Sequence, residues 1–130
     1  MPSPTVVIAQ RDPRAILGLS NDLRAHFPRV AVAQNAKDLR ELLDRHEARV
    51  AIIDLETVDI QEVRKIAMLF GELVIVCTHR SPDEQMWTSA LNAGAVEFCH
   101  PHDVRTIVHA SRMAPSHPCA CVEEEAAMAA

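Results

Sequence analysis

Five short apolar runs alternate along the chain with five segments in which apolar residues recur at helical spacing. The clearest run is Val50–Ile53, which is unbroken, rich in β-branched residues and followed directly by Asp54. A run of this kind is typical of a strand that is buried on both faces of a sheet. The other predicted strands are Thr5–Ala9, Val30–Ala33, Leu73–Cys77 and Val96–Cys99.

Capping residues mark where the predicted helices begin and end. Four starts are indicated by Asp12-Pro13, Asn35 with Asp38, Ser81-Pro82 and Asp103. Gly71 and Gly94 are expected to end the third and fourth helices. Trp87 shares a helical stripe with Ala90 and Leu91, which favours a position in the core over a surface contact.

A strand followed by a helix, repeated five times, predicts a parallel sheet with helices on both faces and right-handed crossovers. The expected fold class is α/β, a flavodoxin-like (βα)5 doubly wound parallel sheet with strand order 2-1-3-4-5. Residues 1–113 are expected to form one domain. The periodicity stops near Ala114, and residues 114–130 are expected to be a flexible tail or the start of a linker.

Composition narrows the classes of function. The net charge is −5 and the basic residues are scattered, which argues against direct nucleic-acid binding. No signal peptide and no apolar stretch long enough to span a membrane is found, so the predicted location is cytoplasmic. Cys77 and Cys99 fall in predicted strands and are expected to be small buried hydrophobes.

Asp54 is the first candidate for chemistry. A carboxylate at the carboxyl end of a buried parallel strand lies at the sheet edge where open α/β folds bind ligands. The alternative is that Asp54 only caps the loop that follows.

The order of these motifs resembles the receiver (CheY-like) domains of two-component response regulators, which serve phosphorelay signal transduction. The resemblance covers roughly Thr5–Met113. It rests on an apolar first strand that runs into Asp12-Pro13, on IIDL around Asp54, on VIVCT ending at Thr78, and on ALNAGAVEF leading into His100-Pro101. Each match is weak alone, but their order and spacing are fairly specific for the fold.

The resemblance implies roles for three residues. Asp54 stands at the position that accepts a phosphoryl group from a histidine kinase. Thr78 matches the hydroxyl residue that follows the phosphoryl oxygen, and Phe98 matches the switch aromatic that rotates with it. Receivers also need Mg²⁺, held by an acidic pair at the end of the first strand, and a lysine before the proline after the fifth strand.

This sequence departs from that pattern around the expected pocket. Gln10 and Arg11 stand where the acidic pair belongs, and His100 stands where the lysine belongs. His79 replaces the small residue that commonly follows the hydroxyl. The segment from Phe98 to Pro101 is also one residue shorter than usual.

These changes oppose metal binding. Mg²⁺ prefers hard oxygen ligands, of which Gln10 offers one that is neutral. The charge of Arg11 repels the metal and is able to pair with Asp54 instead. Asp12 is a replacement ligand beside Asp54, although an N-cap role fits it better. His100 pairs with a phosphoryl group only when it is protonated.

We therefore expect an atypical receiver, or pseudo-receiver. It is not an enzyme, needs no cofactor, and acts through a protein partner or a fused output domain. Receivers use the face of their fourth helix, fifth strand and fifth helix for such contacts, and a homodimer through that face (here Asp83–Ala93 and Val104–Met113) is an open alternative.

Two other functions remain. The first is a response regulator that is phosphorylated on Asp54 by a histidine kinase, with Mg²⁺ at the site. The second is metal binding, for which the thiols and imidazoles form two groups: Cys99, His100 and His102 near the fifth strand, and His117, Cys119 and Cys121 in the tail. CxC spacing is not the usual zinc knuckle, so a reduced tail without metal is the simpler reading.

Overall fold

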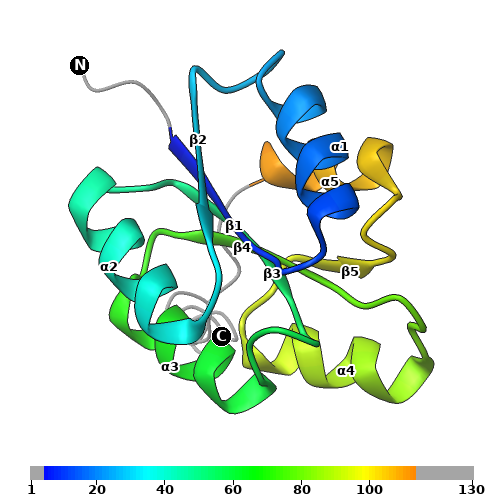
Figure 1. The fold of residues 1–130 in the computed structure, drawn as a ribbon. Helices are drawn as coiled ribbons and strands as arrows, with labels where there is room; N and C mark the ends of the chain where they lie inside the picture. The colour runs from blue at the N-terminus through cyan, green and yellow to red at the C-terminus, as the bar shows by residue number, and fades with distance from the viewer. Residues whose placement is uncertain (1–4, 114–130) are drawn as a thin grey trace, which may run out of the picture.

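The structure is a computed structural model that describes residues 5–113. Its elements alternate from strand to helix throughout (Figure 1). They are β1 (Thr5–Ala9), α1 (Pro13–Leu23), β2 (Arg29–Ala33), α2 (Ala36–His46), β3 (Val50–Asp54), α3 (Ile60–Leu69), β4 (Val74–Thr78), α4 (Glu84–Ala93), β5 (Glu97–Cys99) and α5 (Val104–Ser111). None of the helices in this described part is long and apolar enough to cross a membrane.

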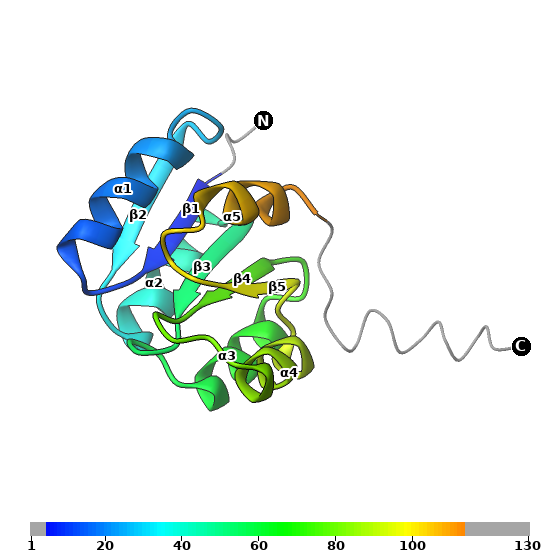
Figure 2. The ribbon, with the colours of Figure 1, turned by 90° about the vertical axis from the view of Figure 1, so that its right-hand side faces the viewer.

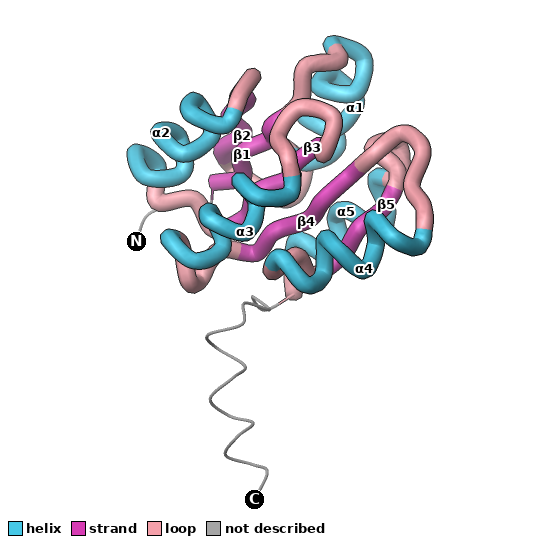
Figure 3. The backbone as a smooth tube through the Cα atoms, turned by 90° about the horizontal axis from the view of Figure 1, so that it is seen from below, coloured by secondary structure: helices cyan, strands magenta, loops and turns pink. Residues whose placement is uncertain are grey.

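The five strands form one parallel sheet in the order β2-β1-β3-β4-β5, which confirms the predicted fold. Helices α1 and α5 cover one face, and α2, α3 and α4 cover the other (Figure 2). Seen from below, α3 and α4 lie side by side (Figure 3). Asp54 pairs in register with Thr78, and Thr78 with Cys99, so the carboxyl ends of β3, β4 and β5 meet at one edge.

Alternation along the central strands builds a core on each face of the sheet. Val7, Ile53 and Ile75 face α2, α3 and α4, and Ile8 and Ile52 face α1 and α5. All five residues of β1, β3 and β4 are buried, as the unbroken apolar runs predict. The carboxyl edge of the sheet is therefore built on strands that are packed on both faces.

Both described thiols belong to this core. Cys77 is fully buried and Cys99 is 9% exposed. Burial raises the pKa of each thiol to about 12, so neither is a thiolate at neutral pH. The prediction that they are small buried hydrophobes is confirmed.

Three predicted caps are confirmed, and one is wrong. Asp12, Asn35 and Asp103 each accept a backbone N–H in the first turn of their helices. The fourth helix begins later than Ser81-Pro82 predicts. Its N-cap is Asp83, whose Oδ1 accepts the N–H of Met86 at 2.8 Å. The backbone N–H of Ser81 is bound to Nδ1 of His79 instead, which keeps Ser81 in the loop.

Three further predictions concern α3 and α4. Gly94 ends α4 in the left-handed conformation, with φ 119°, as expected of a C-terminal glycine. Helix α3 ends at Leu69, before Gly71, and its C-cap is Phe70. The predicted core position of Trp87 is wrong, because its side chain is 46% exposed. The fully buried residues of α4, Ala90 and Ala93, lie in its last turn, while in the first turn Met86 packs against the core and Trp87 faces outward.

Candidate functional site

The loops that follow β1, β3, β4 and β5 enclose a hollow of about 480 Å³ at the carboxyl edge of the sheet. It is lined by Gln10, Arg11, Asp12, Asp54, Glu56, Thr57, Arg80, His100, Pro101 and His102. The structure thus brings together most of the residues that the sequence singles out. Thr78 contacts Asp54 from β4, whereas His79 and Phe98 do not line the hollow.

Asp54 lies at the base of this pocket with 3% of its surface exposed. Its Oδ1 accepts the hydroxyl hydrogen of Thr78 at 3.0 Å, and its Oδ2 accepts the N–H of Glu56 at 3.2 Å. Burial raises the pKa of Asp54 above its ordinary value of 3.8, and the Thr78 hydrogen bond opposes that rise. Asp54 does cap the loop that follows it, since it accepts the backbone N–H of Glu56. Its hydrogen bond with Thr78 also joins β3 to β4.

Gln10 is buried at the end of β1, with 5% of its surface exposed. Its Oε1 accepts the backbone N–H groups of Arg11 at 2.9 Å and Asp12 at 3.1 Å. The one neutral oxygen that Gln10 offers is therefore used by its own loop. Asp12 is the N-cap of α1, and its Oδ1 accepts the N–H of Arg14 at 3.1 Å.

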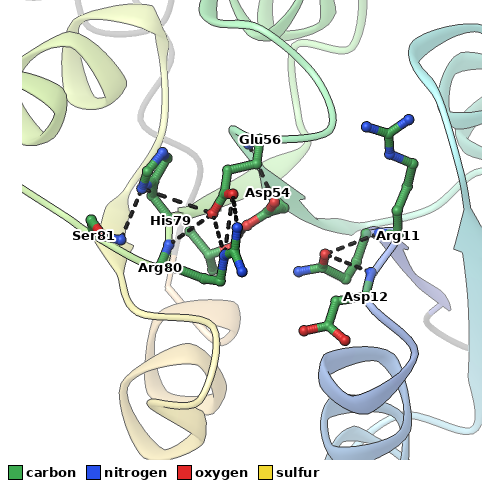
Figure 4. Close-up of polar contacts among 9 residues, drawn as sticks. Arg11, Asp12, Asp54, Glu56, His79, Arg80 and Ser81 are labelled. Carbon is green, nitrogen blue, oxygen red and sulfur yellow. Dashed lines mark hydrogen bonds and ion pairs between the residues drawn. The ribbon is translucent and has the colours of Figure 1, made fainter.

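Arg11 does not pair with Asp54, which corrects the expectation from the sequence. Figure 4 shows its side chain extending away from the Asp54 carboxylate. Within residues 5–113, ion pairs join Arg40 to Glu62 and Arg80 to Glu56, and Nδ1 of His79 lies 4.0 Å from Oε2 of Glu56. Arg11 takes part in none of them, because the backbone at the end of β1 directs it outward while Gln10 turns inward.

The sequence interpretation missed Glu56 and Arg80, which form the shortest polar contact of the pocket. Nη2 of Arg80 lies 2.7 Å from Oε1 of Glu56, and Nε lies 3.0 Å from Oε2. The backbone N–H of Arg80 also donates to Oε2 at 3.2 Å. These bonds lower the pKa of Glu56 to about 2. A signal was available: each residue stands two positions after a member of the paired Asp54 and Thr78.

His79 is turned toward its own loop. Its Nδ1 accepts the backbone N–H of Ser81 at 2.9 Å and lies 4.0 Å from Oε2 of Glu56. A nitrogen that accepts an N–H carries no proton, so His79 is not the donor in its contact with Glu56. Its ring stands beside the pocket and supports the loop that carries Arg80.

His100 lines the pocket at the position of the expected lysine. Its Nδ1 accepts the backbone N–H of His102 at 3.0 Å, which leaves Nε2 as the nitrogen that carries the proton. Phe98, the switch-aromatic candidate, is 6% exposed and packs in the core on the side of α3 and α4.

The residues present do not fit a magnesium ion. The side-chain oxygen of Gln10 accepts two backbone N–H groups, and one carboxylate oxygen of Asp12 accepts the N–H that it caps at the start of α1. Residues 5–113 contain no group of three His, Cys, Asp or Glu side chains placed to hold a metal. Zinc fits Cys99, His100 and His102 no better, because Cys99 is buried in the core and Nδ1 of His100 already accepts the backbone N–H of His102. The second candidate group, His117, Cys119 and Cys121, lies outside the described residues.

Comparison with solved structures identifies the architecture. A response regulator from Thermotoga maritima matches with a TM-score of 0.73 at 19% identity, covering 85% of this chain and 99% of that one. A CheY-like protein, tadZ, from Pseudomonas aeruginosa matches with a TM-score of 0.66 at 21% identity, covering 83% and 98%. The chain has the fold of a response-regulator receiver domain.

A third match is to the RcsB response regulator of Salmonella typhimurium, with a TM-score of 0.72 at 19% identity. It covers 84% of this chain but 57% of that one, so RcsB extends beyond its receiver fold. Neither the family models nor the curated proteins give a match to this sequence. At these identities the receiver fold is shown, and the activity has to be argued from the pocket.

Proposed function

We propose that residues 1–113 form a receiver-type signalling domain that does not depend on Mg²⁺-assisted phosphorylation. The observation that carries this proposal is Gln10, whose side-chain oxygen binds two amides of its own loop. Phosphoryl transfer to a carboxylate needs a cation that neutralises charge as it develops, and in receivers a metal supplies it. In this pocket the two positions of the expected acidic pair hold Gln10, whose amide oxygen is already hydrogen-bonded, and Arg11, whose guanidinium points away from Asp54.

The domain acts, in this proposal, through contacts with a protein partner or with a fused output domain, and not as an enzyme. Exposed apolar side chains on α1, α3, α4 and after α5 support a contact surface; on α4 and after α5 they are Trp87, 46% exposed, and Met113, 47% exposed. A homodimer through α4, β5 and α5 would use these last two side chains. Residues 114–130 would be a tail or the start of a linker, and the setting would be cytoplasmic.

The proposal is tested by restoring the acidic pair that would hold Mg²⁺. The double variant Gln10→Asp with Arg11→Asp restores carboxylates at the two positions of the acidic pair, which line the same hollow as Asp54. Clustered carboxylates repel one another, so the variant should melt at a lower temperature than wild type without metal. Millimolar Mg²⁺ should restore its stability, because a ligand that binds only the folded state stabilises it. Adding His100→Lys should then improve labelling by a small phosphodonor.

Wild type is the matched control in these melts. Its melting temperature should not change when Mg²⁺ replaces NaCl at equal ionic strength. A rise for wild type as large as that of the double variant would mean that the native donors already bind the metal, and the proposal would fail.

A second function is favoured by one observation. The hydroxyl of Thr78 and the carboxylate of Asp54 meet at 3.0 Å beside an open hollow, and the resemblance to receivers implies a phosphoacceptor role for this carboxylate. In this alternative a histidine kinase phosphorylates Asp54 despite the changes at Gln10, Arg11 and His100. Labelling of Asp54 in wild type would decide in its favour.

A further inference from the structure

The Asp54 pocket contains a cation of its own. Arg80 follows β4 by two residues, and its guanidinium is held against the carboxylate of Glu56 through Nη2 and Nε. Figure 4 shows the two groups side by side next to Asp54. The side chain of Arg80 is 70% exposed, whereas that of Glu56 is 29% exposed, so the arginine lies on the outer side of the pair.

The charge of Arg80 serves more than one carboxylate. Its pKa is raised chiefly by the hydrogen bond and charge of Glu56, and further by the charges of Asp12 and Asp54. All four residues line the same hollow. The guanidinium therefore stands in the field of three acidic side chains that come from the ends of β1 and β3.

The same contact joins two loops. Asp54 and Thr78 are paired in the sheet, and below the ion pair the Thr78 hydroxyl binds Asp54. The backbone N–H of Leu55 also donates to the carbonyl of Thr78 at 2.8 Å. Above these bonds, Glu56 accepts both the side chain and the backbone N–H of Arg80. Two sets of hydrogen bonds thus join the loop after β3 to the loop after β4: one set involves Asp54, Leu55 and Thr78, and the other involves Glu56 and Arg80.

We propose that Arg80 is the resident cation of the Asp54 pocket, held there by Glu56, and that this pair closes the two loops over Asp54. The inference rests on the proposed function, since it says what balances the pocket's charge where no metal does. A guanidinium is suited to the task because it is always charged and binds a carboxylate through two parallel hydrogen bonds. Lysine would keep the charge and lose the second bond.

Arg11 provides the comparison. It lines the same hollow and carries the same charge, but it forms no ion pair within residues 5–113. If position in the pocket alone mattered, the two arginines would be equivalent. If the contact with Glu56 matters, only the replacement of Arg80 should have an effect.

The test compares Arg80→Ala with Arg80→Lys and with the control Arg11→Ala. Because Arg80 is largely exposed, each variant should fold. In Arg80→Ala, the backbone N–H groups of residues 56 and 80 should exchange with deuterium faster by about tenfold or more, since both loops lose their outer fastening. Arg11→Ala should exchange like wild type, and Arg80→Lys should fall between.

A second measurement reads the charge. Millimolar Mg²⁺ should raise the melting temperature of Arg80→Ala, whose carboxylates have lost their cation, and should leave Arg80→Lys and Arg11→Ala unchanged. The inference is overturned if Arg80→Ala matches Arg11→Ala in both measurements. A wild-type response to Mg²⁺ would instead refute the proposed function, and the exchange rates would still decide the role of Arg80.

Discussion

Replacing Thr78 by valine removes one hydrogen-bond donor from a buried carboxylate and keeps the shape of the side chain. Thr78 is 1% exposed and Asp54 is 3% exposed, so the bond between them lies inside the protein. Asp54 would keep only the N–H of Glu56, at 3.2 Å. A hydrogen bond to a charged group contributes about 1.5–3 kcal/mol, and Thr78→Val should lower the free energy of unfolding at neutral pH by about that amount.

The loss should depend on pH in a defined direction. The pKa of Asp54 in the folded state lies above its ordinary value of 3.8, so the folded state binds more protons than the unfolded state between those two values. Wild-type stability therefore falls as pH rises through that window. Removing Thr78 raises the pKa of Asp54 further and extends the window upward. The difference between the variant and wild type should be small below pH 3.8 and largest at neutral pH.

Urea unfolding at several pH values measures this difference directly. Thr78→Ser keeps a hydroxyl and is the control for the bond, and Asp54→Asn is the control for the charge. In the Asp54→Asn background, Thr78→Val should cost less than in wild type. An equal loss at acid and neutral pH would refute the reasoning, because it would place the effect in packing rather than in the carboxylate.

Three further predictions concern the scaffold. Gly18→Ala should stabilise the protein by about 0.5–1 kcal/mol in urea unfolding, because an added Cβ in α1 meets open space, whereas Gly94→Ala should destabilise it by about 1–2 kcal/mol, because its φ is 119°. Ile53→Ala should cost about 2–5 kcal/mol, while Leu17→Ala, at a side chain 63% exposed, should change stability by less than about 0.5 kcal/mol. Truncation after Met113 should leave the melting temperature nearly unchanged, and a drop that appears only after chelation would favour metal binding in the tail.

The architecture could be predicted because local signals agree with the fold. The apolar run of Val50–Ile53 fixes a buried central strand, and the alternation with capped helices leaves few topologies for a parallel sheet. The meeting of Asp54 and Thr78 follows from the same fold, since the carboxyl ends of neighbouring parallel strands share an edge.

Side-chain directions at that edge could not be predicted. Gln10 and Arg11 are adjacent in sequence, yet one turns inward to bind its loop and the other extends away from Asp54. The carboxylate with which an arginine pairs depends on the geometry of its loop. The loop after β4 places Arg80 against Glu56. The later start of α4 has a similar origin, because both Ser81 and Asp83 are good caps and only the loop decides between them.

The central claim is that this receiver fold works without Mg²⁺-assisted phosphorylation of Asp54. Its most direct test is the intact mass of wild-type protein after incubation with acetyl phosphate and Mg²⁺, with Asp54→Asn as the control. The account predicts that wild type and Asp54→Asn both remain unmodified. An added phosphoryl group on wild type that is absent from Asp54→Asn would contradict the account and establish Asp54 as a phosphoacceptor.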